Sequence, residues 1–147
     1  TLSLHDAFRS AVFLNIEGRV AEGPGENIFI FKDGVLRTND VTESILEGIT
    51  RTSLLEVARD LGLKTKVGPI DKEEFLAAEE AFFSGTAVEV VPITHITDGS
   101  NPAVQTTKHT VGSGTPGPVT AQLRNTFMDL VRGKIKTYEK WLTLSND

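Results

Sequence analysis

The hydrophobic pattern of the first third of the chain predicts a series of short antiparallel strands. Residues 27–31 are rich in aromatic and β-branched residues, and the dipeptide Asp33-Gly34, a strong two-residue hairpin signal, separates them from a second short run at residues 35–37. Before them, an apolar run at residues 11–15 and a shorter one at residues 19–21 flank a turn. These segments predict a meander that leads into a hairpin.

Two longer stretches have the spacing of amphipathic helices. The first begins near Gly48 and ends at Gly62, a natural C-terminal stop. The second begins at Pro118, and Tyr138 and Trp141 are expected to pack against its end. The apolar positions of the first helix are Leu54, Leu55, Ala58 and Leu61. Those of the second helix are Leu123, Phe127, Leu130, Val131 and Ile135.

The remaining segments are mostly strands and loops. Residues 64–70 and 79–83 are typical of strands, and residues 88–97 form a β-rich run interrupted by a proline. Between the first two, Asp71 and Glu74 have the spacing of a capping box and predict a short helix. We expect a turn at residues 98–102, a loop over residues 103–117, and a ragged end at residues 1–10 that includes the tail of a helix.

Composition and charge narrow the function without fixing it. The 147 residues suit a single domain, residues 1–147, and the net charge of −5 argues against nucleic acid or an anionic membrane as the main partner. No apolar run is long enough to cross a bilayer and no signal-peptide pattern occurs, so we expect a cytoplasmic protein. With no cysteine and three histidines without ligand spacing, no metal site is expected.

Three places in the sequence are candidates for chemistry. Glu22 and Glu26 lie in a turn with two glycines and a proline, where a carboxylate could accept a proton or pair with a cation, or could be a solvated surface acid. Gly48 and Thr50 mark the start of a helix, which could hold a phosphate dianion or could be an ordinary capped helix end. Residues 84–86, Ser-Gly-Thr, end a strand and could bind an anion or form an ordinary turn.

Several strings of residues resemble one known family. EGPGENIF at residues 22–29, KDGVL at 32–36, LEGITR at 46–51 and FFSGTAVEVVPI at 82–93 occur in the order found in the class IV, or fold type IV, pyridoxal-phosphate aminotransferases. PGPVT at residues 116–120 and the tail behind it are most similar to the branched-chain amino acid aminotransferases. The resemblance covers nearly the whole chain from about Ala11 onward, and implies the C-terminal large domain of such an enzyme.

The resemblance implies roles for individual residues. Glu22 would pair with the pyridine nitrogen of pyridoxal 5'-phosphate, and Glu26 would fix the turn and neighbouring basic groups. The residues implied in cofactor binding are Glu22, Leu46, Gly48, Ile49, Thr50 and Thr86. Those implied in binding the substrate carboxylate are Thr86 and Ala87. The substrates implied are leucine, isoleucine or valine with 2-oxoglutarate.

The Schiff-base lysine of the family is not found in the chain. In family members it lies more than thirty residues before the position of Glu22, upstream of Thr1, and the only basic residues ahead of Glu22 are Arg9 and Arg19. The smaller N-terminal domain of the family is missing as well. We therefore expect no catalytic residue in this chain, weak or absent cofactor binding, and little or no transaminase activity.

The fold expected from the resemblance and the pattern is α+β: a barrel-like large domain with mixed sheets and helices packed outside. Apolar surface left exposed at its edge predicts a homo-oligomer. Two other functions stay open. Within the enzyme class these are a D-amino-acid transaminase or an aminodeoxychorismate lyase, and outside it a non-catalytic α/β module that binds another small anion.

Overall fold

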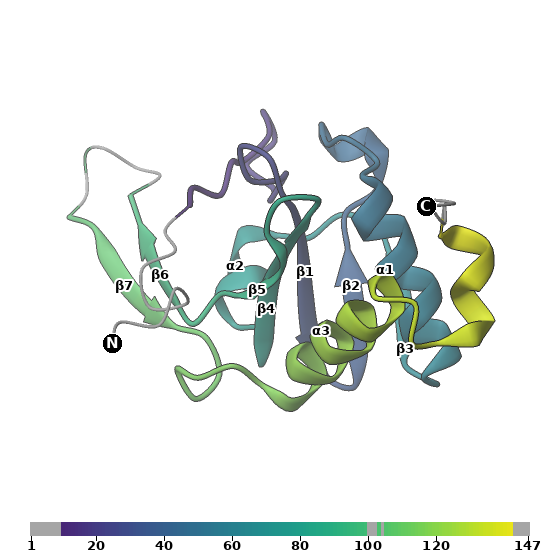
Figure 1. Ribbon diagram of the computed structural model, residues 1–147. Coiled ribbons are helices and arrows are strands. Elements are labelled where there is room, and N and C mark those ends of the chain that lie inside the picture. The colour runs from purple at the N-terminus through teal and green to yellow at the C-terminus, as the bar shows by residue number, and fades with distance from the viewer. Residues whose placement is uncertain (1–9, 100–102, 104, 143–147) are drawn as a thin grey trace.

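A five-stranded mixed sheet forms the centre of the molecule in the computed structural model, which describes residues 10–99, 103 and 105–142 (Figure 1). The strands run in the order β3-β2-β1-β4-β5. Only β2 and β3 pair in parallel, whereas the three other pairs are antiparallel. The strands are β1 (Asn27–Lys32), β2 (Val35–Thr38), β3 (Lys64–Val67), β4 (Glu80–Gly85) and β5 (Glu89–Pro92).

The hairpin between β1 and β2 forms where it was predicted. Asp33 and Gly34 both have positive φ, 49° and 75°, the conformation that a two-residue turn needs to match the twist of the flanking strands. The hairpin places β1 in the middle of the sheet, between β2 and β4. The turn that contains Glu22 therefore leads directly into the central strand.

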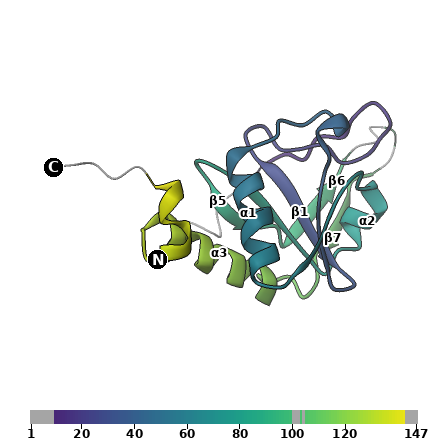
Figure 2. The same cartoon turned by 90° about the vertical axis from the view of Figure 1, so that its right-hand side faces the viewer.

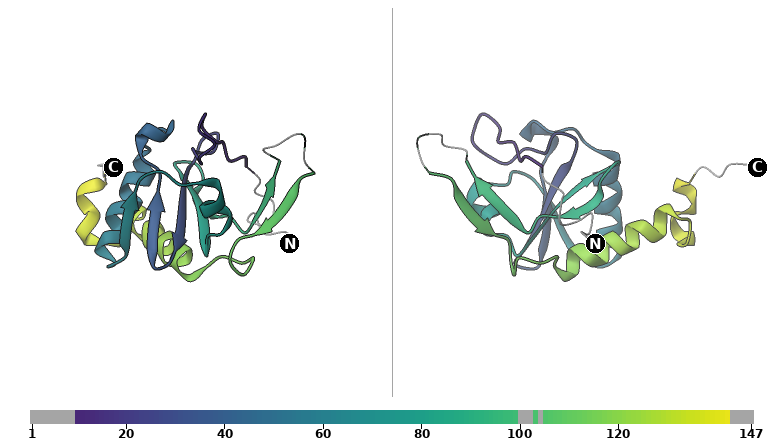
Figure 3. Two further views of the ribbon diagram at one scale, coloured as in Figure 1. Left: turned by 180° about the vertical axis from the view of Figure 1, so that it is seen from behind. Right: turned by 60° about the vertical axis from the view of Figure 1, so that its left-hand side comes forward.

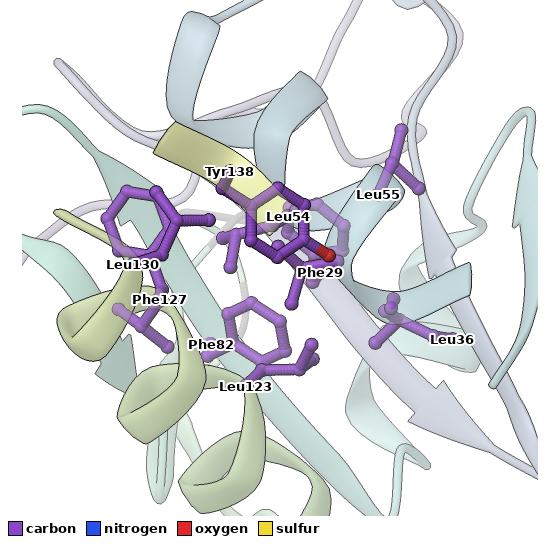
Figure 4. Close-up of a cluster of buried hydrophobic side chains, with 12 residues drawn as sticks. Phe29, Leu36, Leu54, Leu55, Phe82, Leu123, Phe127, Leu130 and Tyr138 are labelled. Atoms are coloured by element: carbon purple, nitrogen blue, oxygen red, sulfur yellow. The ribbon is translucent and has the colours of Figure 1, made fainter. Parts of the chain in front are cut away.

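Helices cover both faces of the sheet. Figure 2 shows α1 (Ile49–Asp60) on one side of β1 and α2 (Lys72–Leu76) on the other. Alternate residues of β1 consequently enter two separate cores. Phe29 stacks on Phe82 at 4.9 Å between ring centroids in the core beneath α1 and α3 (Pro118–Val131), which Figure 4 shows. Ile28 and Ile30 pack on the other face with Phe75 of α2.

A second, two-stranded sheet lies apart from the first. It pairs β6 (His95–Asp98) with β7 (Thr107–Thr110), and Figure 3 shows this ribbon at the end of the molecule opposite the C-terminal segment. Strand β7 lies within residues 103–117, where a loop was predicted, so that prediction was wrong. Its sequence, TKHT, has no apolar alternation, and its pairing with β6 alone makes it a strand.

The N-terminal meander is present with less regular pairing than predicted. Residues 11–15 form no strand; one isolated bridge joins Leu14 to Val20, and the Phe13 amide donates to the Glu22 carbonyl at 2.9 Å. The ragged end predicted for residues 1–10 lies outside the described residues, except for Ser10. The turn predicted at residues 98–102 is described only as far as residue 99.

The helix predictions hold with corrections at their ends. Helix α1 runs as predicted, except that Leu61 lies beyond its last residue and is 37% exposed. Helix α3 ends at Val131, which is exposed, and Ile135 belongs to the turn before a 3-10 helix, η3 (Lys136–Trp141). Tyr138 of η3 is buried in the core, as predicted for the end of this helix.

The capping box predicted for α2 is absent. Asp71 occupies the N-cap position, but its side chain makes no capping hydrogen bond. The Glu74 carboxylate instead accepts from the Arg37 guanidinium on β2. A tertiary ion pair has therefore replaced the local cap.

The observed arrangement agrees with the predicted α+β class, with a mixed sheet and helices outside. The barrel-like shape is not confirmed, since the five strands follow a linear order from β3 to β5. That residues 1–147 form a single domain stays a prediction. Within the part of the chain that the structure covers, no helix combines the length and apolar character needed to span a bilayer.

Candidate functional site

One pocket of about 140 Å³ collects most of the residues singled out from the sequence. Its walls come from the turn before β1, the loop before α1 and the end of β4, three segments far apart in the sequence. The lining residues are Glu22, Pro24, Gly25, Glu26, Asn27, Leu46, Gly48, Ile49, Thr50, Gly85 and Thr86. All six predicted cofactor-binding residues are among them. Ala87, predicted to bind the substrate carboxylate, is exposed and is not one of the lining residues.

Glu22 is half-buried and held through one carboxylate oxygen. Its Oε2 accepts hydrogen bonds from the Asn27 side-chain amide at 3.2 Å and from the Leu46 backbone amide at 3.1 Å. No hydrogen bond from the described residues reaches Oε1. The carboxylate thus has a fixed position and one oxygen left to accept from a ligand.

The start of α1 forms another wall of the pocket. Gly48 is the N-cap, with φ 70° and ψ 117°, and no side chain caps the helix, so the alternative of an ordinary capped helix end does not hold. The first helical hydrogen bond runs from the Thr52 amide to the Gly48 carbonyl at 3.0 Å. The amides of Ile49 and Thr50 therefore have no intrahelical acceptor, and together with the helix dipole they favour an anion.

Arg51 stabilises the loop that leads into α1. It is 4% exposed, and its guanidinium donates to the carbonyls of Asn39 at 2.6 Å and Glu47 at 3.1 Å. It also donates to the Thr38 hydroxyl at 3.3 Å. Burial lowers the pKa of Arg51 from its ordinary value, but an arginine stays protonated in proteins. A positive charge is therefore buried close behind the helix start.

Close backbone contacts define the third wall. A Cβ on Gly85 would lie 2.8 Å from the Gly25 carbonyl oxygen, so the end of β4 packs directly against the turn. Glu26 Oε2 accepts from the Gly25 amide at 3.2 Å and from the Ser10 hydroxyl at 3.3 Å. These contacts agree with the turn-fixing role implied for Glu26. No basic side chain of the described residues pairs with it.

Two residues of the site were not predicted individually. Asn27 was interpreted as the first residue of a strand, and Arg51 only as part of a motif. Their bonds join segments 19 and 12 residues apart in the sequence, and no local pattern shows such contacts. The one available signal was that both lie inside the strings that carry the family resemblance.

Comparison with known proteins supports the resemblance. The amino-transferase class IV family model matches residues 3–96, well over half of the chain. The chain belongs to the class IV aminotransferases. The family prediction is thereby confirmed, and the α+β fold is the fold type IV of this family.

The class IV members to which this chain is similar include branched-chain aminotransferases. One from Pseudomonas aeruginosa is 46% identical over 134 residues, which cover 91% of this chain and 40% of that protein. The crystal structure of the T.th. branched-chain amino acid aminotransferase with pyridoxamine 5'-phosphate is 38% identical with a TM-score of 0.82, covering 94% of this chain and 42% of that one. The same enzyme complexed with N-(5'-phosphopyridoxyl)-L-glutamate is 39% identical with a TM-score of 0.81, covering 91% and 42%. The chain thus spans about two-fifths of the length of the relatives that it matches.

Proposed function

We propose that the pocket binds pyridoxal 5'-phosphate and that the chain contributes to a branched-chain amino acid transaminase. The observation that carries the proposal is that the Glu22 carboxylate and the uncapped start of α1 line the same pocket. A phosphorylated pyridine needs both features, an acid for its ring nitrogen and an anion site for its phosphate.

The residues present fit this group. Glu22 Oε1 is free to pair with a protonated ring nitrogen, while Oε2 is held by two donors. The Ile49 and Thr50 amides suit a phosphate, which the dipole of α1 and the buried Arg51 charge would stabilise. Leu46 is 77% exposed, so its apolar side chain is available to lie against one face of the ring.

Bound pyridoxal phosphate supplies an electron sink for the carbanion formed at the substrate α-carbon. In this proposal Glu22 keeps a proton on the ring nitrogen, which makes that sink effective. The hydroxyl of Thr86 would bind the phosphate, and the amides of Thr86 and Ala87 would receive the substrate carboxylate. The exposed position of Ala87 agrees with a ligand that approaches from outside the pocket.

A second, larger concave surface suits the cofactor less well. A groove of about 700 Å³ runs between α1, α3 and η3 and shares Gly48, Ile49 and Thr50 with the pocket. Its other walls include Phe127, Val131 and Trp141, and neither Glu22 nor Thr86 lines it. The acids that line the groove are Glu47 and Glu56, and only the smaller pocket holds all six predicted cofactor-binding residues, so we assign the cofactor to the smaller pocket.

The relatives support the substrates proposed. They are named branched-chain amino acid aminotransferases, and one binds a phosphopyridoxyl adduct of glutamate, the amino acid that corresponds to 2-oxoglutarate. These names favour leucine, isoleucine or valine over the substrates of a D-amino-acid transaminase or an aminodeoxychorismate lyase. A cytoplasmic location and a homo-oligomer stay predictions.

The pocket in this chain offers no amine to the cofactor, since no lysine is among its lining residues. At about 140 Å³ it is also smaller than the roughly 300–1,000 Å³ typical of pockets that enclose a whole drug-sized ligand. We therefore propose that the chain alone binds the cofactor weakly and has little transaminase activity.

The experiment is a titration of the chain with pyridoxamine 5'-phosphate, which needs no lysine, followed by protein NMR. We expect shifts at the amides of residues 46–50 and at Thr86. Replacing Glu22 by Gln should weaken binding by about tenfold or more, because a hydrogen bond between charged groups is worth about 1.5–3 kcal/mol.

Glu17→Gln is the matched control, since Glu17 is an exposed acid outside the pocket. It should bind as the unchanged chain does. Equal binding by Glu22→Gln would show that Glu22 is not the ring acid. A pocket that binds inorganic phosphate but discriminates against pyridoxamine 5'-phosphate would favour the non-catalytic anion-binding module.

A further inference from the structure

A single side chain, Asn27, contacts the acid, the loop and the helix start of the pocket. Its amide nitrogen donates to Glu22 Oε2 at 3.2 Å and to the Leu46 carbonyl at 2.8 Å. Its amide oxygen lies against Gly48, where an added Cβ would come within 1.9 Å. Asn27 thus contacts the acid, the loop residue beside it, and the N-cap of α1.

The hydrogen bonds among these residues form a closed triangle. Asn27 donates to both Glu22 and the Leu46 carbonyl, while the Leu46 amide donates to Glu22. The backbone amide of Leu46 is therefore bound to the Glu22 carboxylate, and its backbone carbonyl to the side-chain amide of Asn27. Because Oε2 has no other donor within the described residues, removing Asn27 would leave the carboxylate with a single hydrogen bond.

Asn27 is itself well placed to be rigid. It is 6% exposed and is the first residue of β1, the central strand of the sheet, where its backbone pairs opposite Ser84 of β4. A side chain fixed by a central strand holds its contacts more precisely than one on a loop. The two segments that it contacts, the turn and the loop before α1, belong to no strand or helix.

We infer that Asn27 is a positioning residue that sets both the orientation of the Glu22 carboxylate and its separation from the start of α1. The inference rests on the proposed function, because this separation matters only for a ligand that spans from a ring nitrogen to a phosphate. Asn27 presents Oε1 to that ligand by holding Oε2, and it does so without contacting the ring nitrogen itself.

The experiment compares Asn27→Ala and Asn27→Asp with the unchanged chain, using pyridoxamine 5'-phosphate and inorganic phosphate as probes. Both variants should bind pyridoxamine 5'-phosphate about tenfold or more weakly, the loss expected for a hydrogen bond to a charged group. Inorganic phosphate, which needs only the helix start, should be affected clearly less. Asn27→Asp keeps the size of the side chain but replaces a donor to Glu22 by a second carboxylate.

A second readout separates positioning from folding. With pyridoxamine 5'-phosphate labelled with ¹⁵N in the ring, the ring nitrogen should be protonated in the complex of the unchanged chain and less so in that of Asn27→Ala. Asn15→Asp is the matched control, because the Asn15 amide also donates to a carboxylate, that of Glu43 at 2.9 Å, outside the pocket. This control should change neither the affinity nor the ring signal.

The outcomes are distinguishable. If the unchanged chain does not bind pyridoxamine 5'-phosphate, the proposed function fails. If it binds and Asn27→Ala binds equally well with the same ring signal, the positioning role is overturned while the proposed function stands. Loss of the folded state in both Asn27 variants would also overturn it, since Asn27 would then be a residue required for folding.

Discussion

Gly48 satisfies two requirements that no other residue type meets at the start of α1. Its φ of 70° lies in the left-handed region, and the Asn27 amide oxygen occupies the space where a Cβ would stand. A left-handed conformation costs an ordinary residue roughly 1–2 kcal/mol, and the blocked space adds to that. The pocket therefore depends on the absence of a side chain at this position.

This predicts that Gly48→Ala loses more stability than its backbone alone explains. Gly62→Ala is the matched control: Gly62 has a similar φ of 79°, but nothing lies within 4 Å of an added Cβ. In urea unfolding we expect a loss of about 1 kcal/mol for Gly62→Ala and clearly more for Gly48→Ala. Only Gly48→Ala should also weaken binding of pyridoxamine 5'-phosphate, because Asn27 and the helix start must move apart.

Equal losses of stability in the two alanine variants would show that the Asn27 side chain moves aside at little cost, which would contradict the importance of the close contact.

At the residue scale the sequence indicated which glycines and acids belong to the motifs. It could not indicate that Gly48 contacts Asn27, which lies 21 positions earlier in the sequence, because that contact depends on how the loop before α1 packs against β1.

Helix α3 is capped by a residue from another element. Its N-cap, Gly117, has no side chain, and the buried Glu80 carboxylate of β4 takes the place of a cap. Glu80 accepts from the Val119 amide at 3.1 Å and from the Thr120 amide and hydroxyl at 2.7 Å each. An acid at a helix N-terminus also interacts favourably with the helix dipole.

We predict that Glu80→Gln destabilises the protein by about 1–3 kcal/mol, since a buried charge-assisted cap is lost while the size of the side chain is kept. Chemical unfolding measures the effect. Glu79→Gln is the neighbouring control, because Glu79 makes one exposed hydrogen bond, to the Asp33 amide. A loss at position 80 no larger than that at position 79 would mean that the dipole and the hydrogen bonds of Glu80 contribute little.

The elements themselves were predictable where a local signal specifies them. The Asp33-Gly34 turn and the Gly62 stop fix the ends of β1, β2 and α1 through backbone conformation alone. Strand β7 and the Glu80 cap were not predictable, because each depends on a partner distant in the sequence. The capping box of α2 failed for the same reason, as Glu74 has a stronger partner in Arg37.

At the scale of the whole molecule, the C-terminal 3-10 helix η3 is joined to the fold through a partly buried polar contact. The Tyr138 hydroxyl donates to Asp60 at the end of α1 at 2.5 Å, and the Tyr138 ring packs against Trp141.

The fold class and the family could be predicted from the sequence, since they depend on motifs and on hydrophobic periodicity. The exposure of individual apolar side chains, such as Val131, could not be predicted, because it depends on where η3 packs.

The hydrogen bond between Tyr138 and Asp60 predicts a specific dependence of stability on pH. Burial, and then the hydrogen bond to Asp60, raise the pKa of Tyr138 from 10.0 to about 12. Between these values the unfolded chain has released the proton and the folded protein has kept it. The contribution of Tyr138 is therefore fully present below pH 10 and is lost as the pH rises towards 12.

As the pH rises across this window, the free energy of unfolding should decrease more in the unchanged chain than in Tyr138→Phe. This variant keeps the ring and cannot ionise. Comparing the two slopes removes every contribution that the two proteins share. Tyr138 is the only tyrosine of the sequence, so the ultraviolet absorbance of tyrosinate reports its titration directly. A tyrosinate signal that appears near pH 10 in the folded protein, with equal slopes for the two chains, would mean that η3 opens without unfolding the rest.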